Sequence, residues 1–245
     1  MSGSNQAVFQ NQRSFGPPPG QQAYTTPGTY SWVAPAEATK VSVVAIGAGG
    51  YGDSPECCRR GGNGAGLGYK NNYTVIPGNS YTVSVGNIST ALCGAGHSYF
   101  VSSAVVQGNK GSAAGGPGEY TGDGGGYGGY GGQCACPCFF RSSGGGGAGG
   151  YSNGVTNAGS GTPSHINSGA GTGGAAGGGK GNGGGGGVGI FGEGTSGASQ
   201  TVSGKSGYGG SGGSGNTTSP IGQAYGGGGA TYTSGSRSNA SAGAV

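Results

Sequence analysis

Residues 125–133 read Gly-Gly-Tyr-Gly-Gly-Tyr-Gly-Gly-Gln, a motif with a period of three residues. This period matches neither the α-helix nor the β-strand, but it matches the left-handed extended helix with three residues per turn. Glycine runs recur at 144–147, 183–187 and 226–229, and most of the 70 glycines of the 245-residue chain follow residue 110. Polyglycine has no side chains to bury, so main-chain hydrogen bonds between neighbouring segments must hold this half of the chain together.

We therefore expect residues 111–245 to form a glycine-rich domain, a bundle of polyglycine II helices joined by loops. Ordering one residue costs about 1–2 kcal/mol of backbone entropy, whereas one hydrogen bond returns about 0.5–1.5 kcal/mol. Only in a helix bonded to several neighbours can the hydrogen bonds come close to offsetting this entropy cost. Such a helix also needs packing, cross-links or a partner chain. A flexible Gly/Ser-rich linker is the alternative, and the recurrence of the runs between loops of varied sequence argues against it.

Interior positions of such a bundle must be glycine, because a Cβ atom would hold the backbones apart. We assign this scaffold role to glycines spread over the runs: Gly125, Gly128, Gly131, Gly146, Gly185 and Gly228. Valine in place of Gly128 or Gly185 is expected to disrupt the scaffold, whereas Tyr151→Ala is expected to be mild. Tyrosines beside the runs are expected to shield the bundle from water: Tyr127, Tyr130, Tyr151, Tyr208 and Tyr225.

The preceding residues, 23–110, have the pattern of a small all-β domain. Stretches rich in strand-forming residues occur at 29–33, 40–43, 73–76, 81–85 and 98–101. Pro77-Gly78-Asn79 between two of them is typical of a tight hairpin. We expect five or six short strands in a β-sandwich with Trp32 as its core anchor. Residues 1–22 are expected to be an irregular arm that docks elsewhere or a frayed terminus.

The predicted fold class is thus an all-β N-terminal sandwich followed by a polyglycine II helix bundle, with essentially no α-helix. Charged residues make up 7% of the chain and its formal net charge is +4. The basic residues are too scattered for a phosphate-binding stripe, so we expect no nucleic-acid partner. No apolar stretch is long enough for a membrane span, and residues 1–22 lack the features of a signal peptide. We therefore expect no membrane insertion.

Motifs for catalysis are missing from the sequence. It contains no nucleophile elbow, no zinc-protease motif and no phosphate-binding loop with its lysine. Its acidic residues are scattered and suggest no acid–base pair. We expect a protein that is not an enzyme and has no cofactor.

The chain has six cysteines, which we interpret as candidates for disulfides: Cys57, Cys58, Cys93, Cys134, Cys136 and Cys138. The pairing is left open. Single-residue gaps in Cys134–Cys138 differ from the spacing of structural zinc sites, so we expect no metal. Cross-links would limit the entropy of a chain with a small apolar core and would require an oxidising environment, reached by lysis or by secretion without an N-terminal signal.

Four loops between glycine runs are the predicted outward-facing segments: residues 133–143, 151–168, 195–206 and 216–225. Candidate receptor or partner contacts on them are Phe139, Phe140, Arg141, Tyr151 and His165. The adjacent rings of Phe139 and Phe140 could form a contact patch or tuck beneath the loop, and the sequence leaves both open. Ile190-Phe191 is expected to act mainly as a packing plug.

Residues 25–35 and 41–50 resemble the opening of glycine-rich domain proteins of tailed bacteriophages. Further similar stretches extend over most of the chain: residues 72–78, 122–126, 144–151, 187–194 and 243–245. Members of this group are mostly virion structural or tail-fibre-associated proteins, particularly in phages of aquatic cyanobacteria. The glycine half also resembles the T-even-type phage adhesins, in which a polyglycine-helix sandwich presents variable loops to the host surface. Those adhesins do not carry the N-terminal β-domain.

The resemblance implies a structural virion protein, a fibre, spike or surface component that presents loops for host attachment. Its partners would be other virion or fibre subunits and a host-surface glycan or protein, and it would form a homo-oligomer or polymer. It would be located in the virion and so be extracellular after lysis. The alternative is a self-assembling extracellular filament or matrix subunit, with residues 1–22 inserting into a neighbour.

Overall fold

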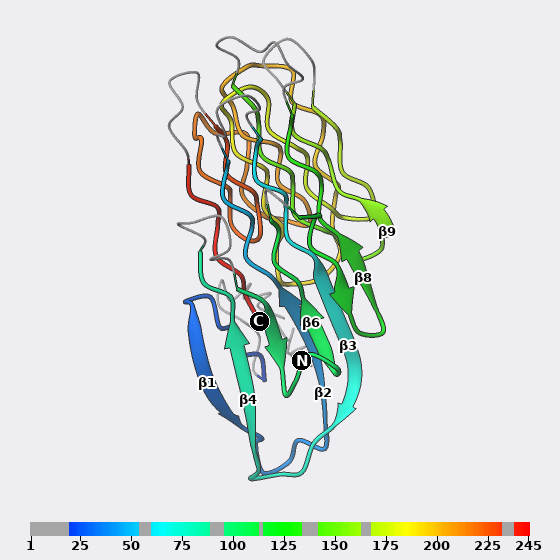
Figure 1. Ribbon diagram of the computed structural model, residues 1–245. Coiled ribbons are helices and arrows are strands. Elements are labelled where there is room, and N and C mark those ends of the chain that lie inside the picture. Colours follow the sequence, from blue (N-terminus) through cyan, green and yellow to red (C-terminus); the bar gives the residue numbers. More distant parts are fainter. Residues whose placement is uncertain are drawn as a thin grey trace, which may run out of the picture.

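The chain is an all-β protein, and the described residues contain no helix, as the sequence predicted. The computed structural model describes residues 20–53, 60–88, 96–112, 115–133, 142–162, 168–231 and 238–245. The molecule is elongated. Strands gather at one end, and long irregular segments run side by side at the other (Figure 1).

Two sheets make up the strand-bearing end. The larger has the order β1-β4-β5-β6-β7, with every neighbouring pair antiparallel. Its strands are β1 (Gly28–Val33), β4 (Ser80–Val85), β5 (Ser98–Phe100), β6 (Val106–Gly108) and β7 (Tyr120–Thr121). β1 therefore lies at one edge of this sheet.

The second sheet has the order β2-β3-β8-β9. Its strands are β2 (Lys40–Ile46), β3 (Leu67–Thr74), β8 (Gly124–Tyr127) and β9 (Gly154–Asn157). β3 is antiparallel to β2 and β8, whereas β9 is parallel to β8. Lys70 on β3 pairs with Asp123, next to β8, at 2.5 Å. β2, like β1, is an edge strand.

The strand predictions at 29–33, 40–43, 81–85 and 98–101 are confirmed by β1, β2, β4 and β5. β3 begins at Leu67 rather than at residue 73. The prediction of a hairpin at Pro77-Gly78-Asn79 is wrong. Strands β3 and β4 on either side of this turn belong to different sheets, so the turn carries the chain from one sheet to the other.

One apolar cluster has members from both sheets. Val43 and Ala45 of β2 pack with Val83, Phe100 and Val106 of the larger sheet, and these side chains are at most 9% exposed. Trp32 borders this cluster without being fully buried. Its ring meets that of Phe100 edge-on, with centroids 5.8 Å apart. The alternating residues of β2 place this set of side chains on one face of the strand.

The opposite face of the β2–β3 pair covers a second cluster. Ile46 and Leu67, which are opposite each other in the ladder, pack with residues of the irregular half: Ala148, Tyr151, Ala176 and Val188. Val44 and Tyr69 extend the contact. β2 is thus covered on both faces, which explains why its sequence, Lys-Val-Ser-Val-Val-Ala-Ile, is apolar at adjacent positions as well as at alternate ones.

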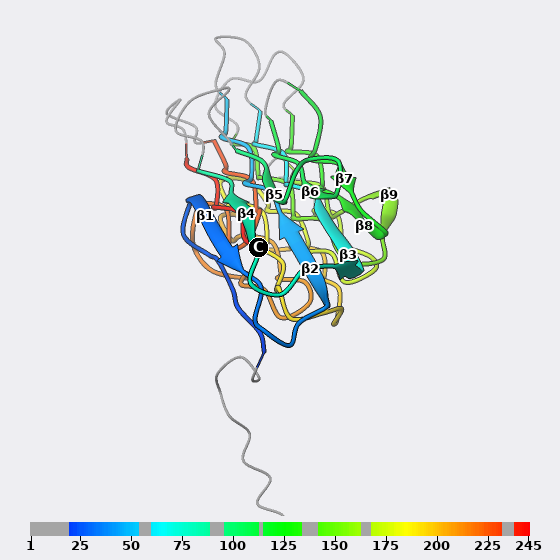
Figure 2. The ribbon, with the colours of Figure 1, turned by 90° about the horizontal axis from the view of Figure 1, so that it is seen from below.

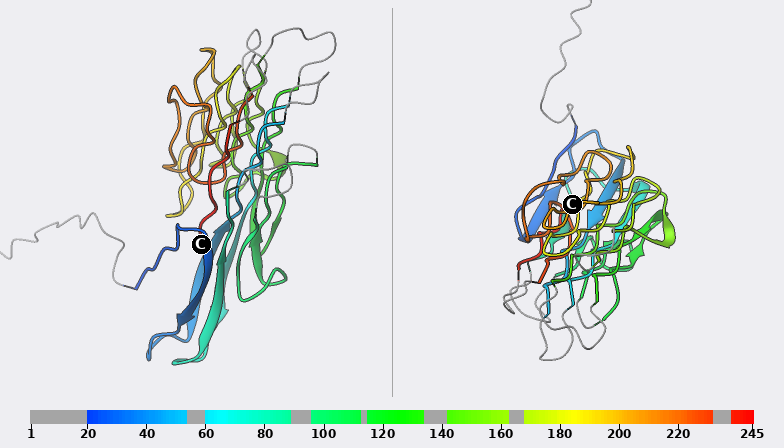
Figure 3. Two further views of the ribbon diagram at one scale, coloured as in Figure 1. Left: turned by 60° about the vertical axis from the view of Figure 1, so that its left-hand side comes forward. Right: turned by 90° about the horizontal axis from the view of Figure 1, so that it is seen from above.

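Main-chain hydrogen bonds hold the glycine-rich segments side by side (Figure 3). Residues 144–149 donate their N–H groups in rotation to three neighbouring segments: residues 159–162, 183–186 and 62–65. Gly144 and Gly147, three residues apart, donate to Thr162 and Gly159 of the first segment at 3.1 and 2.9 Å. The carbonyl groups of the same run accept bonds from further segments: residues 129–132, residues 176–179 and Gly228.

Hydrogen bonds cross the predicted boundary between residues 110 and 111. β8 pairs with β3, and the N–H group of Gly149 donates to Ala65, just before β3. Residues 47–53 and 60–66 also bond to glycine-rich segments from the second half of the chain. The part of the chain predicted to be a separate β-domain therefore supplies segments to the glycine-rich half.

Candidate functional site

The candidate site is the end of the glycine-rich half that lies farthest from the sheets, here called the distal end (Figure 1). The glycine-rich segments that lead to it are in close backbone contact. A Cβ atom on Gly146 would overlap the carbonyl oxygen of Gly129, and one on Gly185 would overlap that of Gly146. Of the other predicted scaffold positions, Gly128, Gly131 and Gly228 also face main-chain oxygens of neighbouring segments. Gly125 lies on β8 instead and faces the carbonyl oxygen of Leu67 in β3, so it belongs to the sheet. Glycine is therefore the residue that fits at these positions.

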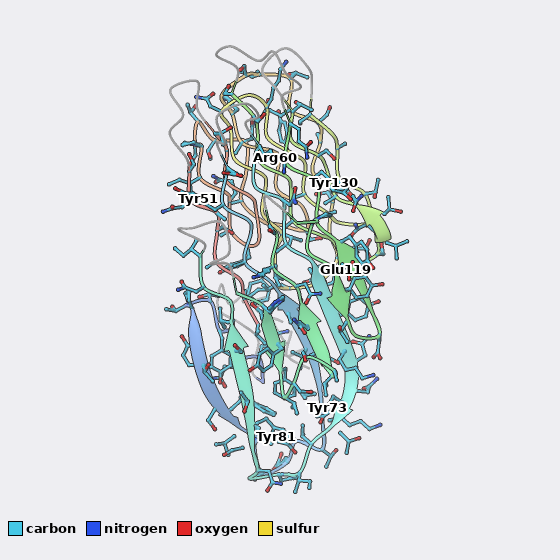
Figure 4. All side chains as sticks on the ribbon, in the orientation of Figure 1. Tyr51, Arg60, Tyr73, Tyr81, Glu119 and Tyr130 are labelled. Carbon is cyan, nitrogen blue, oxygen red and sulfur yellow. The ribbon has the colours of Figure 1, made fainter. Side chains whose placement is uncertain are left out.

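Isolated β-bridges join several segments of the chain at the distal end. Arg60 pairs with Asp53 and with Gln133, and further pairs join Ser143 to Thr231 and Thr162 to Lys180. Figure 4 shows Arg60 in the distal half, remote from Tyr73 and Tyr81 on the sheets. Loops from distant parts of the sequence thus begin and end close together, at the distal end.

Most of the predicted contact residues and all six cysteines lie outside the described residues: Phe139, Phe140, Arg141, His165, Cys57, Cys58, Cys93, Cys134, Cys136 and Cys138. The ends of three of these segments are nevertheless defined. Asp53 and Arg60 flank the first, Gln133 and Ser142 the second, and Thr162 and Ser168 the third. All three segments start from the distal end. The disulfides stay a prediction.

Buried polar side chains fix further loops at the distal end. Gln200, 1% exposed, donates from Nε2 to the Ser206 carbonyl at 2.9 Å and to Asn216 Oδ1 at 3.1 Å, and its Oε1 accepts the N–H of Val202 at 3.0 Å. Its main-chain N–H donates to Ser168 Oγ at 2.6 Å. Among the described residues, every buried side-chain nitrogen and oxygen has a partner. Polar bonds here take the place of the apolar core found in other folds.

Gln200 was not expected from the sequence to have a structural role, and neither was Asn63, which is 4% exposed. Asn63 Oδ1 accepts the N–H of Gly131 at 2.7 Å, and its Nδ2 donates to the Ser112 carbonyl. A lone amide inside a glycine run, as in Gly62-Asn63-Gly64, is the signal that could have indicated it.

The charged residues described at the distal end are mostly basic. Arg60, Lys180 and Lys205 lie there together with Asp53, and Lys180 Nζ donates to the Thr201 carbonyl at 2.8 Å. Among the described residues, the distal end thus carries three basic residues and one acidic residue.

Tyr151 does not face outward. It is 7% exposed, packs in the cluster around Ile46 and Leu67, and lies beside the sheets. Its hydroxyl donates to the Gly189 carbonyl and accepts the N–H of Gly192, each at 3.1 Å, and burial raises the pKa of the phenol. A receptor contact by Tyr151 does not fit this position. The same burial predicts a marked loss of stability for Tyr151→Ala in place of a mild one.

The predicted loops therefore divide between the two ends of the glycine-rich half. Residues 151–157 lie next to the sheets, while residues 201–205 and 216–219 lie at the distal end. Of the Ile190-Phe191 pair, which was expected to pack inward, only Ile190 packs against the buried cluster, whereas Phe191 is 72% exposed. Of the tyrosines expected to shield the bundle, Tyr130 is 47% and Tyr208 is 36% exposed.

The described residues show neither a metal site nor a membrane-spanning helix. No grouping of three or more histidine, cysteine or acidic side chains suited to a metal ion occurs there. Nor does the described part include a helix of the length and apolarity needed to cross a membrane. Comparison with known proteins found no matching family model, no similar curated protein and no similar solved structure.

Proposed function

We propose that the glycine-rich segments are polyglycine II helices packed as a bundle, and that the two sheets form a β-sandwich beneath it. The rotation of donors among three neighbours, with repetition after three residues, supports the first part, since a threefold extended helix directs its N–H groups in that way. The cluster with members from both sheets supports the second.

On this scaffold the protein would act as a structural virion component of a tailed bacteriophage, a fibre, spike or surface protein that presents loops for attachment to the host. The convergence of loop segments at the distal end carries the proposal. Bonds of the main chain fix the ends of these segments, so their intervening residues can vary without loss of the scaffold. Attachment would be non-covalent, and the phage context rests on the sequence resemblance.

The charge distribution favours a negatively charged surface as the binding partner. Among the described residues of the distal end, Arg60, Lys180 and Lys205 outnumber Asp53, and a surface of one sign attracts ligands of the opposite sign. A host glycan rich in phosphate or carboxylate groups fits this requirement. The proposed partners otherwise are further virion or fibre subunits.

Binding to immobilised bacterial lipopolysaccharide tests the attachment proposal. Lys205→Glu changes a charge at the distal end, and Lys40→Glu makes the same change on the sheets. We expect the first variant to bind at least threefold more weakly than the second at low salt, with the difference shrinking as salt increases. Equal binding by the two variants, or none by the wild type to any anionic bacterial glycan, would contradict the proposal.

Electron microscopy of the native protein under non-reducing conditions tests the structural role. Discrete spikes or oligomers of fixed size would support a virion component. Continuous helical filaments would instead support the second candidate, a self-assembling extracellular filament or matrix subunit.

A further inference from the structure

Two tyrosines of the periodic run 125–133 lie on the same side of their segment. The main-chain carbonyl of Tyr127 accepts the N–H group of Ala158 at 3.1 Å, and that of Tyr130 accepts the N–H group of Gly161 at 2.8 Å. The bonding pattern therefore repeats after three residues on both segments. A backbone with this repeat directs the side chains at positions 127 and 130 the same way, about 9 Å apart for a rise of about 3.1 Å per residue.

A third tyrosine extends this pair towards the sheets. Tyr120 belongs to β7, which lies beside β8 and β9 at one side of the molecule (Figure 2). Its ring meets that of Tyr127, at the end of β8, with centroids 5.9 Å apart and ring planes at 72°. This edge-on contact holds the Tyr127 ring in one orientation and so lowers the entropy cost of binding a ligand. Tyr120, Tyr127 and Tyr130 are here called the tyrosine row.

The tyrosine row is accessible to solvent and separate from the apolar core. Neither apolar cluster of the described residues includes its members. Tyr130 is 47% exposed, and the other two are half-buried. The glycines on either side of Tyr130 have no side chains that would cover its ring, and its N–H group has no hydrogen-bond partner among the described residues. Aromatic rings and a main-chain donor are therefore available to a ligand at this surface.

Polar side chains border the tyrosine row. Asn157 lies opposite Tyr127 in the pairing of β8 with β9, and Ser160 follows three residues later in the same segment. Both are half-buried. Glu119, directly before β7, is exposed, and Figure 4 shows it on the same side of the molecule as Tyr130. The row is thus one ring wide, with hydrogen-bonding side chains beside it.

We propose that the tyrosine row binds a neutral, linear polysaccharide of β-linked pyranose sugars, laid along the glycine-rich segment. A pyranose ring has an apolar face of C–H groups, which stacks on the negatively polarised face of an aromatic ring. Its hydroxyl groups project from the edge, towards the polar side chains beside the row. In an extended β-linked chain every second sugar presents the same face, at a repeat close to the expected separation of Tyr127 and Tyr130. Tyrosine makes such contacts with little loss of conformational entropy.

Shape and charge favour such a chain over other occupants. A stable protein interface buries about 800 Å² on each partner, and a row one ring wide is too narrow for that. The exposed carboxylate of Glu119 would repel the phosphate and carboxylate groups of an anionic glycan. The row therefore differs in ligand from the basic distal end, and the inference does not depend on attachment through that end.

Calorimetric titration of the full-length protein tests the site, with cellohexaose and chitohexaose as probes. We expect saturable binding of at least one hexaose. The corresponding disaccharide, cellobiose or chitobiose, should bind at least tenfold more weakly, because it is too short to reach both rings. Binding of neither hexaose, or equal binding of hexaose and disaccharide, would overturn the proposal.

The response to salt separates this test from that of the distal end. A neutral sugar carries no charge for salt to screen, so hexaose affinity should be the same at low and high salt. Binding to anionic lipopolysaccharide through the distal end should instead weaken as salt increases. Loss of either activity alone would therefore contradict only the proposal to which it belongs. A hexaose affinity that falls with salt would contradict the stacking site.

Tyrosine variants test whether the row itself binds the sugar. Tyr130→Ala removes one ring of the row, whereas Tyr208→Ala removes a 36% exposed ring that is also flanked by glycines but lies in another segment. We expect Tyr130→Ala to weaken hexaose binding at least tenfold and Tyr208→Ala to leave it unchanged. Tyr130→Phe keeps the ring and should bind within twofold of the wild type. Circular dichroism verifies that each variant is folded.

Two results with these variants would overturn the proposal. Hexaose binding that survives Tyr130→Ala would show that the ring is not part of the site. If the same variant also loses self-association in light scattering, the row is a contact between copies of the chain. Equal weakening by Tyr208→Ala would show that any exposed tyrosine contributes, so that the row is not a specific site.

Discussion

Gly185 and Gly116 are chemically identical residues in opposite surroundings. A Cβ atom on Gly185 would overlap the main-chain carbonyl of Gly146, which has no flexible end to move away. At Gly116 an added Cβ would meet nothing within 4 Å, and the backbone there is not in the left-handed region. The comparison therefore separates the effect of close backbone approach from the general effect of losing a glycine.

We expect Gly185→Ala to lower the free energy of unfolding by about 3 kcal/mol or more, because neighbouring segments must move apart. Gly116→Ala should change it by less than about 1 kcal/mol, with stabilisation through reduced chain entropy as the favoured direction. Denaturant unfolding monitored by circular dichroism measures both. Similar losses in the two variants would mean that glycine is needed for flexibility and not for space.

Tyr151 contributes through its ring and its hydroxyl separately. Tyr151→Phe removes two hydrogen bonds, to Gly189 and from Gly192, and should cost about 0.5–1.5 kcal/mol for each bond. Tyr151→Ala also empties a buried position between the sheets and the glycine-rich half, and should cost about 3–5 kcal/mol in total. A thermal or urea unfolding series gives both values. An alanine variant no less stable than the phenylalanine variant would contradict the packing role.

His97 makes stability depend on pH. Burial, followed by the nearby Lys110 charge, lowers the pKa of this imidazole, and the main-chain N–H of Lys110 donates to its Nδ1 at 3.3 Å. The unfolded chain therefore takes up the proton more readily. The contribution is complete above the ordinary histidine pKa of about 6.5 and is lost as the pH falls below it.

Urea unfolding at pH 7.5 and pH 5.5 should show lower stability at the acid pH for the wild type, and a smaller difference for His97→Gln. The second histidine, His165, is present in both proteins and so cancels in the comparison. If His97→Gln shows the same difference in stability between pH 7.5 and pH 5.5 as the wild type, the pH dependence comes from other groups.

At the level of elements, sequence pattern predicts strands better than it predicts their partners. Alternation and β-branched residues identified β1, β2, β4 and β5, because these signals are local. The pairing of β1 with β4 and of β3 with β8 joins residues far apart in sequence, and no local signal encodes it. The turn at Pro77–Asn79 has the residues of a hairpin yet leads to another sheet for this reason.

The same limit applies to the candidate site. The loop segments were recognisable as interruptions of glycine runs, but which of them share an end depends on how many times the chain reverses. Gln200 was missed because its role needs Ser168, Ser206 and Asn216 as partners, which only the fold brings together. Tyr151 was misplaced because a tyrosine beside a glycine run has the same local sequence whether it points outward or inward.

Gln200 is also expected to hold the loop at residues 201–205 in place. Gln200→Leu keeps the size of the side chain but leaves the Ser206 carbonyl and the Val202 N–H group without their partner. We expect a loss of about 1–3 kcal/mol for a buried polar group left unsatisfied, together with faster proteolytic cleavage within residues 201–205. Limited proteolysis of Gln200→Leu, compared with the wild type and with the exposed-site control Val202→Ala, measures this. Cleavage at the wild-type rate would show that the loop is fixed by other bonds.

At the scale of the whole molecule, the sheets and the glycine-rich half both depend on β2 and β3. The two halves should therefore unfold together. β2 and β3 contribute one face to the cluster between the sheets and the other to the cluster with Ala148, Ala176 and Val188. Ala65, two residues before β3, accepts a hydrogen bond from Gly149 and donates one to Gly226. Loss of order in the glycine-rich half would remove the cover from the second face of β2 and β3.

We therefore expect a single cooperative unfolding transition. Trp32, in the sheets, reports one half, and Gly185→Ala perturbs the other, so the fluorescence midpoint of Trp32 should fall by the same amount as the calorimetric midpoint in that variant. Phe100→Ala, in the sheet cluster, is the reciprocal change and should also move one common transition. Two calorimetric transitions, with the Trp32 midpoint unmoved by Gly185→Ala, would show instead that the sheets remain folded without the glycine-rich half.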